Sequence, residues 1–348
     1  MSIFDRIAAA SVPLLPRFIV SRVSRRYIAG ETCEDALRAG ARLQAKGYRV
    51  TYDILGESVS SFQGVESMLA EYEALLQALV DRGLERNVST KPTQLGLLLD
   101  PSKSREATQR LTDMVGEAEA FLRYEMEDSP TVDNTLQLFS ALQANKLEQV
   151  GCVLQSMLFR TEQDARNLVA QHGAVNVRLV KGIYVEPASI AFQLPAEVNS
   201  SYLRTAKIIL EGGGFLAIAT HDAVLANQVL ELAREIPGAL ERIEIQVLLG
   251  VQEAFRSKMR DQGIPVRVYV PYGEMWYPYV TRRLRKNPKL ARYALLGLFR
   301  KAKDFVIGVY LPDVLAVAPF YLDWAGVGEG LGNFMSFGDF PLTQTKSS

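Results

Sequence analysis

The sequence is poor in the residues that most often hold transition metals or carry thiol chemistry. It has two cysteines, Cys33 and Cys152, and two histidines, His172 and His221, in 348 residues. Two isolated thiols cannot form a disulfide framework, so they indicate a reducing compartment or no redox role for cysteine. A zinc site of cysteine and histidine would need nearly all of these residues at once, and we therefore expect no metal site.

The chain also lacks an excess of charge of either sign. It carries 39 Lys and Arg against 39 Asp and Glu. Nucleic-acid-binding domains usually have a basic excess, so this balance argues against a general polyanion binder and predicts no nucleic-acid partner. A hydrophobic fraction of 48% with 22% charged residues is typical of a globular protein with a large core.

Long hydrophobic runs are missing as well. No uncharged stretch reaches about 18 apolar residues, the length that suggests a transmembrane helix. Asp5 and Pro13 interrupt the N-terminal apolar stretch, which argues against a secretory signal. Segments 17–26 and 306–327 have basic or apolar character that suits a bilayer surface, although we favour core-packing helices for both. We expect a cytoplasmic protein, with peripheral association at the inner face of the membrane left open.

Glycine-rich phosphate-binding turns are the last missing feature. An open, doubly wound sheet normally carries such a turn after its first strand. Residues 53–57 do not form one, the glycine cluster at 326–332 does not match the GxGxxG register, and no Walker A lysine motif occurs. The sequence therefore disfavours this architecture, which is the main competitor of the one described next.

Short runs of β-branched and aromatic residues recur along the chain, and segments with helical periodicity lie between them. Residues 65–80 are one such helical segment, and Thr161 with Asp164 resembles a capping box that opens another. The strand candidates are Arg49–Leu55, Asn87–Lys91, Phe121–Met126, Gln149–Gln155, Asn176–Lys181, Gly214–Thr220, Ile243–Leu248 and Arg267–Val270.

Repeated strand–helix units require parallel strands with right-handed crossovers, and eight of them suggest a closed (β/α)₈ barrel. We therefore predict an α/β protein with a TIM-like barrel at residues 48–290. Residues 1–47 would form an N-terminal helical arm, and residues 291–348 a C-terminal helical extension and tail.

Chemistry in such barrels sits at the carboxyl ends of the strands. Arg178 and Lys181 would point to opposite faces of a regular strand, so both serve one site only if the chain bends after the strand, which Gly182 permits. The polar residues at the predicted strand ends are Asp53, Glu57, Lys91, Gln94, Glu125, Glu127, Gln155, Arg160, Arg178, Lys181, Thr220, His221, Asp222, Gln246 and Tyr269.

Beyond the last strand candidate, Tyr279, Arg282 and Arg283 have a spacing that places them near one face of a helix. Adjacent guanidinium groups beside aromatic rings suit a small carboxylate that carries an apolar ring. The same residues are equally compatible with a solvated basic helix, because Arg285, Lys286 and Lys289 follow.

These residues resemble the signature of the flavin-dependent proline dehydrogenase family. Tyr279-x-x-Arg282-Arg283 follows a strand that ends in Tyr269-Val-Pro-Tyr-Gly. Further blocks resemble the family in order, from about residue 49 to residue 288: Asp53-Ile-Leu-Gly-Glu57, Ser89-Thr-Lys91-x-Thr-Gln-Leu-Gly, Arg178-Leu-Val-Lys-Gly-x-Tyr184, Ala219-Thr-His-Asp222 and Gln246-x-Leu-x-Gly250.

The resemblance implies a barrel that holds FAD and oxidises L-proline to Δ¹-pyrroline-5-carboxylate, with electrons passed to a quinone. It implies that Lys91, Arg282 and Arg283 hold the substrate carboxylate, that Tyr269, Tyr279 and Leu248 pack the ring, and that Glu57 pairs with Arg282 as a gate. The family carries an acidic residue on its third strand, and the resemblance implies that Glu125 is this residue. The implied FAD contacts are Gln155, Arg178, Lys181, Thr220, His221 and Gln246.

Three alternatives stay open. A flavin dehydrogenase of another cyclic secondary amino acid, such as hydroxyproline, would share these motifs. A metal-dependent hydrolase could use Glu57, Glu125, Glu127, His221 and Asp222. A non-catalytic binding protein on a decayed barrel is suggested by Lys286, which stands where the family usually has a glutamate.

Overall fold

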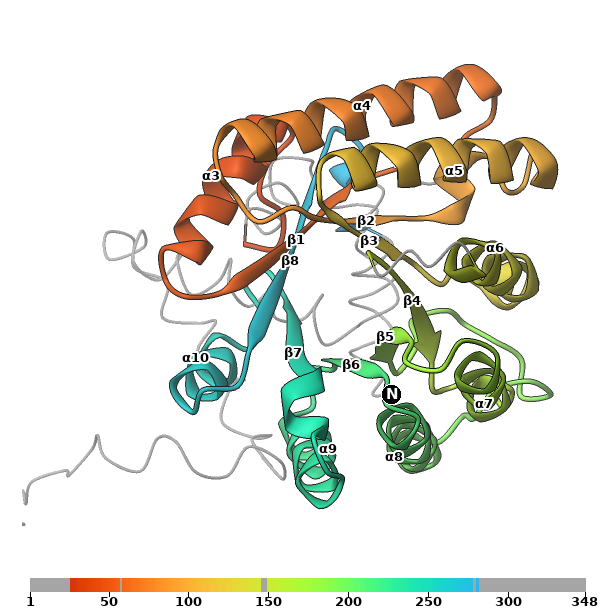
Figure 1. Cartoon of the computed structure of the whole chain (residues 1–348), viewed down its shortest axis with the longest axis vertical. Helices are drawn as coiled ribbons and strands as arrows, with labels where there is room; N and C mark the ends of the chain where they lie inside the picture. The colour runs from red at the N-terminus through yellow and green to blue at the C-terminus, as the bar shows by residue number, and fades with distance from the viewer. Residues whose placement is uncertain (1–25, 57, 145–148, 278–279, 282–348) are drawn as a thin grey trace, which may run out of the picture. The chain divides into compact units, whose positions relative to one another are not determined.

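A computed structural model describes residues 26–56, 58–144, 149–277 and 280–281. Within this part, eight parallel strands form a closed barrel in chain order (Figure 1). The strands are β1 (Arg49–Ile54), β2 (Asn87–Thr90), β3 (Phe121–Tyr124), β4 (Val150–Gln155), β5 (Asn176–Val180), β6 (Phe215–Ala219), β7 (Ile243–Leu248) and β8 (Val266–Tyr272). The predicted barrel is confirmed, and the predicted strand ends differ from these by two residues at most.

Parallel pairing between the first and the last strand closes the barrel. Arg49 of β1 lies opposite Arg267 of β8, and the register continues to Ile54 opposite Tyr272. Closure brings the carboxyl ends of all eight strands to one mouth of the barrel and their amino ends to the other.

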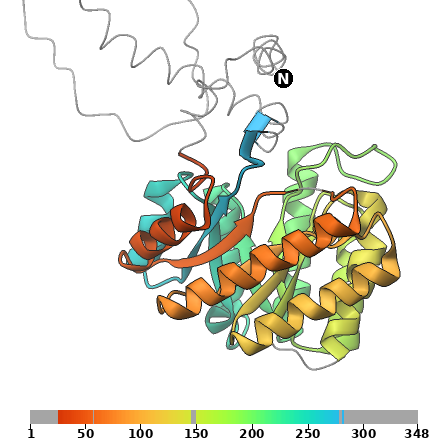
Figure 2. The same cartoon turned by 90° about the horizontal axis from the view of Figure 1, so that it is seen from above.

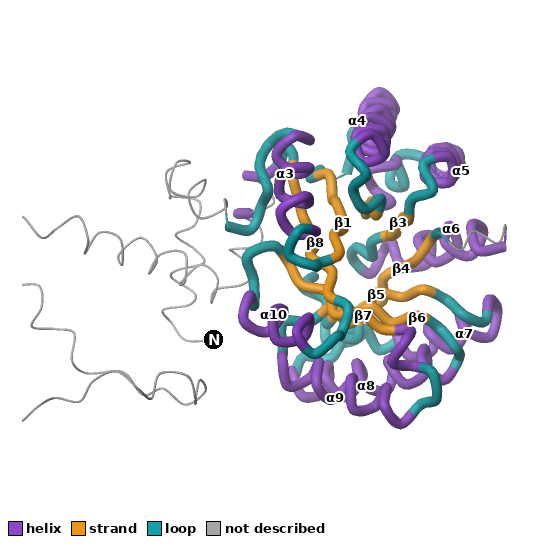
Figure 3. The backbone as a smooth tube through the Cα atoms, turned by 60° about the vertical axis from the view of Figure 1, so that its left-hand side comes forward, coloured by secondary structure: helices purple, strands orange, loops and turns teal. Residues whose placement is uncertain are grey.

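Helices surround the ring of strands on the outside (Figure 3). Each crossover is helical, as parallel neighbours require. The helices are α3 (Cys33–Gln44), α4 (Phe62–Asp81), α5 (Pro101–Glu117), α6 (Val132–Ala144), α7 (Thr161–His172), α8 (Pro195–Glu211), α9 (Ala223–Glu235) and α10 (Glu253–Asp261), with short 3₁₀ turns η2 (Pro92–Leu95), η3 (Ser129–Thr131) and η4 (Ala239–Arg242).

Helix α4 shows why the apolar periodicity predicted the packing. Its buried residues recur at three- and four-residue intervals and face the barrel. Tyr72 is fully buried and its hydroxyl donates a 2.8 Å hydrogen bond to the Ser89 carbonyl of β2. Helices α4 and α5 run side by side (Figure 2).

Helix α3 lies within the predicted N-terminal arm but packs against β1 and β8. Thr32 and Asp35 form a reciprocal capping box at its start, which satisfies N–H groups that the first helical turn leaves without partners. A Cβ atom on Gly40 would lie 1.9 Å from the Tyr52 hydroxyl oxygen, so the small residue permits close packing on β1. The domain boundaries at residues 47 and 290 stay a prediction.

The capping box expected at Thr161 is wrong. Helix α7 begins at Thr161 itself, after Arg160, and Thr161 directs its hydroxyl to the Gln155 carbonyl instead. Asp164 accepts a 2.7 Å bond from the Arg160 guanidinium. The side chains that suggested a cap therefore tie the helix to the end of β4.

Among the helices in the described part of the chain, none is long and apolar enough to cross a bilayer.

Candidate active site

The carboxyl-terminal mouth of the barrel contains a buried ion pair between β1 and the end of β2. The Lys91 ammonium donates to both carboxylate oxygens of Asp53, at 2.9 and 3.1 Å. Asp53 is fully buried, and desolvation, opposed by the Lys91 charge, raises the pKa of its carboxyl group. The Tyr269 hydroxyl of β8 also bonds to Asp53. The three groups thus present an ammonium and a phenol beside a carboxylate that is costly to ionise.

A second charged group lies beside this pair. Arg178 of β5 is buried, and its guanidinium bonds to Glu125 at the end of β3. Its Nη2 donates to the Ser89 hydroxyl at 3.3 Å, and its carbon Cζ lies 5.2 Å from the centre of the Tyr269 ring. The guanidinium is therefore held between an anion and an aromatic face, with little freedom to rotate.

Gln246 of β7 completes the arrangement around Arg178. Its carbonyl oxygen accepts a 2.5 Å bond from Arg178 Nε, while its amide nitrogen donates to Glu244 at 2.5 Å. Because the Glu244 carboxylate can only accept, it fixes the orientation of the Gln246 amide. Arg267 lies 2.8 Å from Glu244, and although burial opposes ionisation, this cation leaves the pKa of Glu244 lowered. A continuous chain of polar contacts thus runs through the barrel to Arg178.

The acids that follow β3 have different partners. Glu125 pairs with Arg178, whereas Glu127 accepts bonds from the backbone N–H and the hydroxyl of Thr93, at 3.1 and 2.8 Å. Gln155 at the end of β4 donates a 2.7 Å bond to the Glu127 carbonyl. Burial raises the pKa of Glu127, and the bonds from Thr93 oppose the rise.

This raised pKa predicts a pH-dependent effect of Glu127→Gln. The folded protein binds the proton more tightly than the unfolded chain, so wild-type stability falls as pH rises from about 4.3 through the folded-state pKa. The variant has no such loss, so its stability relative to wild type should rise between pH 4 and pH 8. Urea unfolding at both pH values measures the difference, and a gap that does not change with pH would contradict the assignment.

The ends of β5 and β6 form a separate cluster. Lys181 lies beyond β5 and its ammonium donates a 2.8 Å bond to Asp222. Gly182 has φ +112°, and a Cβ there would lie 2.3 Å from the Met157 sulfur, so this bend requires glycine. The bend expected from the sequence is confirmed. The Thr220 hydroxyl accepts from the Asp222 N–H at 3.2 Å.

Asp222 also caps helix α9, because its carboxylate accepts bonds from the N–H groups of Val224 and Leu225, both at 3.2 Å. Asp222→Ala should cost about 1 kcal/mol through loss of the cap, whereas Asp222→Asn should cost almost nothing. Both changes remove the charge that holds Lys181. Thermal unfolding of the two variants separates the effects, and equal losses would show that the ion pair, not the cap, carries the energy.

His221 and Leu248 lie together at the ends of β6 and β7. The Leu248 N–H donates to His221 Nε2 at 3.4 Å, and Gln252 donates to the His221 carbonyl at 2.9 Å. The structure therefore groups Lys91, Tyr269, Glu125, Arg178 and Gln246 around Asp53, and joins Lys181, Thr220 and His221 into a neighbouring cluster with Asp222. Four expected residues, Glu57, Tyr279, Arg282 and Arg283, lie outside the described residues.

Sequence reasoning missed three buried polar residues that support this site: Ser89, Glu244 and Arg267. A signal for Glu244 was present, because Ile243–Leu248 alternates aliphatic residues with Glu244 and Gln246. Two polar residues two positions apart in an otherwise apolar strand point to the same face. That face is the barrel interior, where a buried charge needs an ion pair or hydrogen bonds within the barrel.

Three acids that a metal-dependent hydrolase could use have other partners here. Glu125 binds Arg178, Glu127 binds Thr93, and Asp222 binds Lys181 and the start of helix α9. Across the described ranges, no group of three or more Cys, His, Asp and Glu side chains could hold a metal ion.

Two family models match the chain. The model for proline dehydrogenase matches residues 36–292, which include the whole barrel, and the model for nickel-dependent hydrogenase matches residues 285–348. The second match covers a minor part of the chain, outside the described residues, and that part contains no cysteine or histidine.

Solved structures of similar fold include proline utilization A (PutA) from Bdellovibrio bacteriovorus inactivated by N-propargylglycine. The TM-score is 0.70 at 24% identity, over 75% of this chain. PutA from Bradyrhizobium japonicum (mutant D779W) gives a TM-score of 0.64 at 21% identity, over 78% of this chain. This chain spans only 32% of each of those chains, and at such identities the likeness shows the barrel fold.

Curated relatives are similar over most of their length. Proline dehydrogenase 2 of Bacillus subtilis (strain 168) is 32% identical over 282 residues, which are 81% of this chain and 92% of that protein. Proline dehydrogenase of Deinococcus radiodurans is 30% identical over 293 residues, or 83% and 94% of the two chains. With a family match that includes every strand of the barrel, this chain belongs to the proline dehydrogenase family.

Proposed function

We propose that this protein oxidises L-proline to Δ¹-pyrroline-5-carboxylate with FAD as the hydride acceptor and a quinone as the final electron acceptor. The observation that carries the proposal is the buried group of Asp53, Lys91, Tyr269 and Arg178 at the carboxyl mouth of the barrel. It lies in a chain whose relatives are named proline dehydrogenases.

The substrate end of the site has one described cation and one aromatic wall. The Lys91 ammonium suits the proline carboxylate, to which Arg282 and Arg283 would add two guanidinium groups. Tyr269 and Leu248, both partly buried, would pack the pyrrolidine ring together with Tyr279. Glu57 would pair with Arg282 as a gate that excludes water during the reaction. A clamp on the carboxylate fixes which ring carbon faces the cofactor.

The cofactor end draws on four consecutive strands, β4 to β7. Gln155, Lys181, Thr220 and His221 stand at or just beyond their carboxyl ends, and Arg178 and Gln246 lie two residues before the ends of β5 and β7. Cations, amides and a hydroxyl on one rim are a donor set that fits a flavin ring and a pyrophosphate. When bound, FAD supplies the two-electron acceptor that no side chain of the protein can supply. The Lys181 ammonium, one third exposed, would meet the negative charge of the phosphates.

Arg178 has the clearest electrostatic task. Glu125 and Gln246 hold its guanidinium in place before the reaction begins. With FAD bound, this fixed cation would stabilise negative charge on the flavin ring, and the guanidinium would not have to change its orientation during the reaction. Gln246 has both ends of its amide engaged by Arg178 and Glu244, so its role is to orient Arg178 as well as to contact the cofactor.

The electron acceptor implies where the protein works. A quinone is dissolved in the bilayer, so we place the enzyme in the cytoplasm with peripheral contact at the inner membrane face. Segments 17–26 and 306–327, whose sequences suit a bilayer surface, are the candidates for this contact.

A spectroscopic titration tests the proposal. The purified protein should be yellow, and anaerobic L-proline should bleach the flavin absorbance in proportion to the enzyme present. Hydroxyproline should bleach it far more slowly, because Tyr269 leaves little room for a ring hydroxyl. A colourless protein that FAD cannot reconstitute would reject the function, and faster bleaching by hydroxyproline would reassign the substrate.

A further inference from the structure

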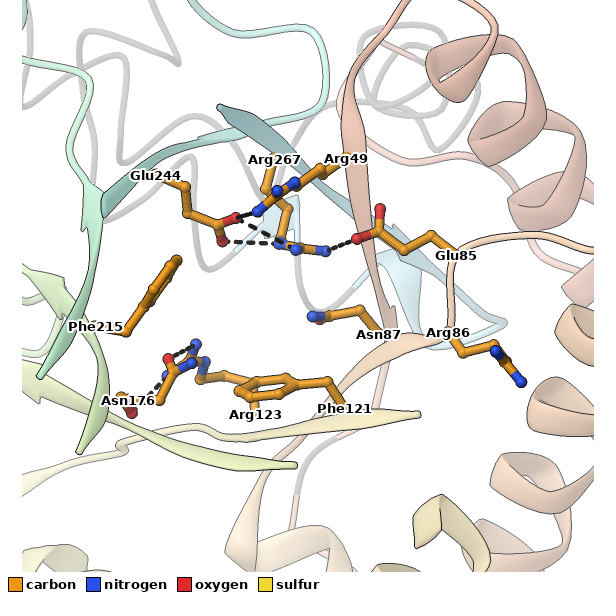
Figure 4. Close-up of a pocket in the computed structure, with 10 residues that line it drawn as sticks. All are labelled: Arg49, Glu85, Arg86, Asn87, Phe121, Arg123, Asn176, Phe215, Glu244 and Arg267. Carbon is orange, nitrogen blue, oxygen red and sulfur yellow. Dashed lines mark hydrogen bonds and ion pairs between the residues drawn. The ribbon is translucent and has the colours of Figure 1, made fainter. Parts of the chain in front are cut away.

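A cavity opens at the opposite mouth of the barrel, where the strands begin (Figure 4). Its volume is about 250 Å³, enough for a small molecule. Arg49, Asn87, Phe121 and Asn176 line it, and each is the first residue of its strand. The cavity is therefore distinct from the candidate active site, which lies at the carboxyl ends of the same strands.

The lining carries more positive than negative charge. Four arginines and two glutamates contribute, and both glutamates are engaged by Arg267, which lies 2.8 Å from Glu244 and 2.7 Å from Glu85. Arg49 shares Glu244 at 3.3 Å. Neither carboxylate of the cavity forms an ion pair with Arg123.

Among the four arginines of the lining, Arg123 is the one for which the described residues supply no ion pair. It is 2% exposed, and within the described part of the chain no carboxylate pairs with it. Its Nη1 donates to the carbonyls of Cys152 and Asn176, at 2.9 and 3.0 Å, and its Nη2 to the Asn176 side chain at 2.6 Å. Gly151 makes room for it, since a Cβ there would lie 2.3 Å from Nη1. The backbone is thus built around a buried guanidinium.

Three of the five N–H groups of Arg123 are used in this way, and its Nε has no acceptor. Burial, together with the positive charge of Arg178, lowers the pKa of Arg123 to about 9. The Oδ1 atom of Asn87 is also buried without a donor. Both residues line the cavity, so a ligand bound there is one way to supply the missing donor and acceptor.

We propose that the amino-terminal mouth of the barrel binds a small oxyanion that also carries a hydrogen-bond donor, with Arg123 as its anchor. The oxyanion would accept from the unused N–H groups of Arg123, and the donor would meet Asn87. Protonated phosphate and small amino or hydroxy acids share this chemistry. Two phenylalanines, Phe121 and Phe215, form the apolar part of the lining. Binding at this mouth does not depend on the proposed proline chemistry.

Asn87→Asp provides the sharpest test, because it is isosteric and places a carboxylate in the cavity. Thermal unfolding and calorimetric titration of the full chain should show saturable stabilisation of wild type by phosphate, or by glycine or lactate, above that of chloride at equal ionic strength. The variant should bind at least about tenfold more weakly, the effect of 1.4 kcal/mol. Without added anion it should unfold at a higher temperature than wild type. Arg123→Met should also lose binding, and exposed Arg105→Met should retain it.

The result that overturns the proposal is equally specific. Anions that act no differently from chloride, or that bind Asn87→Asp as tightly as wild type, exclude the site. An anion that binds at the opposite mouth instead would lose affinity in Lys91→Met and keep it in Asn87→Asp. The separate responses of these two variants also keep failure of this site distinguishable from failure of the proline site, whose test is flavin bleaching.

Discussion

Replacing Arg178 with methionine should lower the free energy of unfolding by about 3–5 kcal/mol, the range for breaking a buried ion pair by removing one partner. The side chains of Arg178 and Glu125 are only 5% and 15% exposed, so Glu125 would lose its cationic partner at a site with little access to water. Gln246 would lose the donor to its carbonyl oxygen at the same time. The loss therefore comes mainly from partners left unsatisfied, and not from the contact itself.

Urea unfolding of the full chain at neutral pH measures this loss. The matched control is the double variant Arg178→Met with Glu125→Gln. It replaces the unpaired Glu125 carboxyl group with an amide and should recover part of the stability. Arg178→Lys should fall between wild type and methionine, because an ammonium cannot reach Glu125 and Gln246 with a planar fork. A loss below about 1 kcal/mol in Arg178→Met, typical of an exposed pair, would contradict the buried network.

Replacing Lys91 with methionine should raise the KM for L-proline steeply. Loss of one partner from a buried, hydrogen-bonded charge pair costs about 2–5 kcal/mol, which corresponds to a factor of about thirty to several thousand. The substrate carboxylate would enter a site that still holds the Asp53 carboxyl group and no longer has the Lys91 ammonium beside it. In the proposed binding mode Lys91 holds the carboxylate and does not touch the reacting carbon, so kcat should change much less than KM.

Steady-state kinetics of the flavin-loaded enzyme test this expectation, with a double variant as the control. Adding Asp53→Asn to Lys91→Met replaces the carboxyl group with a neutral amide and should lower KM again, because any negative charge on Asp53 repels the substrate carboxylate. A KM for Lys91→Met within threefold of wild type would show that the two arginines bind the carboxylate alone. A fall in kcat without a change in KM would place Lys91 at the reacting centre instead.

The barrel was predictable because its information is local. Each strand is a short run of β-branched or aromatic residues, and each helix shows its buried face as a spacing of three and four residues. Such patterns survive in a single sequence, and parallel strands joined by helices leave few topologies. The family motifs likewise sit within short segments near the strand ends, which explains why the sequence alone could propose Lys91, Arg178 and Tyr269 as site residues.

The partners of those residues could not be predicted in the same way. Arg178 bonds to residues 53 and 68 positions away in the chain, and Lys91 pairs with a residue 38 positions before it. Which charges meet depends on how the strands register when the barrel closes, and no periodicity within one strand contains that information. The capping box expected at Thr161 failed for a related reason, because the end of β4 competed for the hydroxyl.

The sequence by itself determined the strands, the helices, the residue types at the carboxyl-terminal mouth of the barrel and the family. Only the tertiary structure decided that Asp53 is buried against Lys91, that Glu244 orients Gln246 toward Arg178, and that Arg123 lies beside a cavity with no carboxylate paired to it. Patterns within a short segment set the secondary structure. The free-energy cost of burying a charge depends instead on the partners that closure of the barrel brings within about 3 Å of it. The interior electrostatics of this barrel follow from that closure.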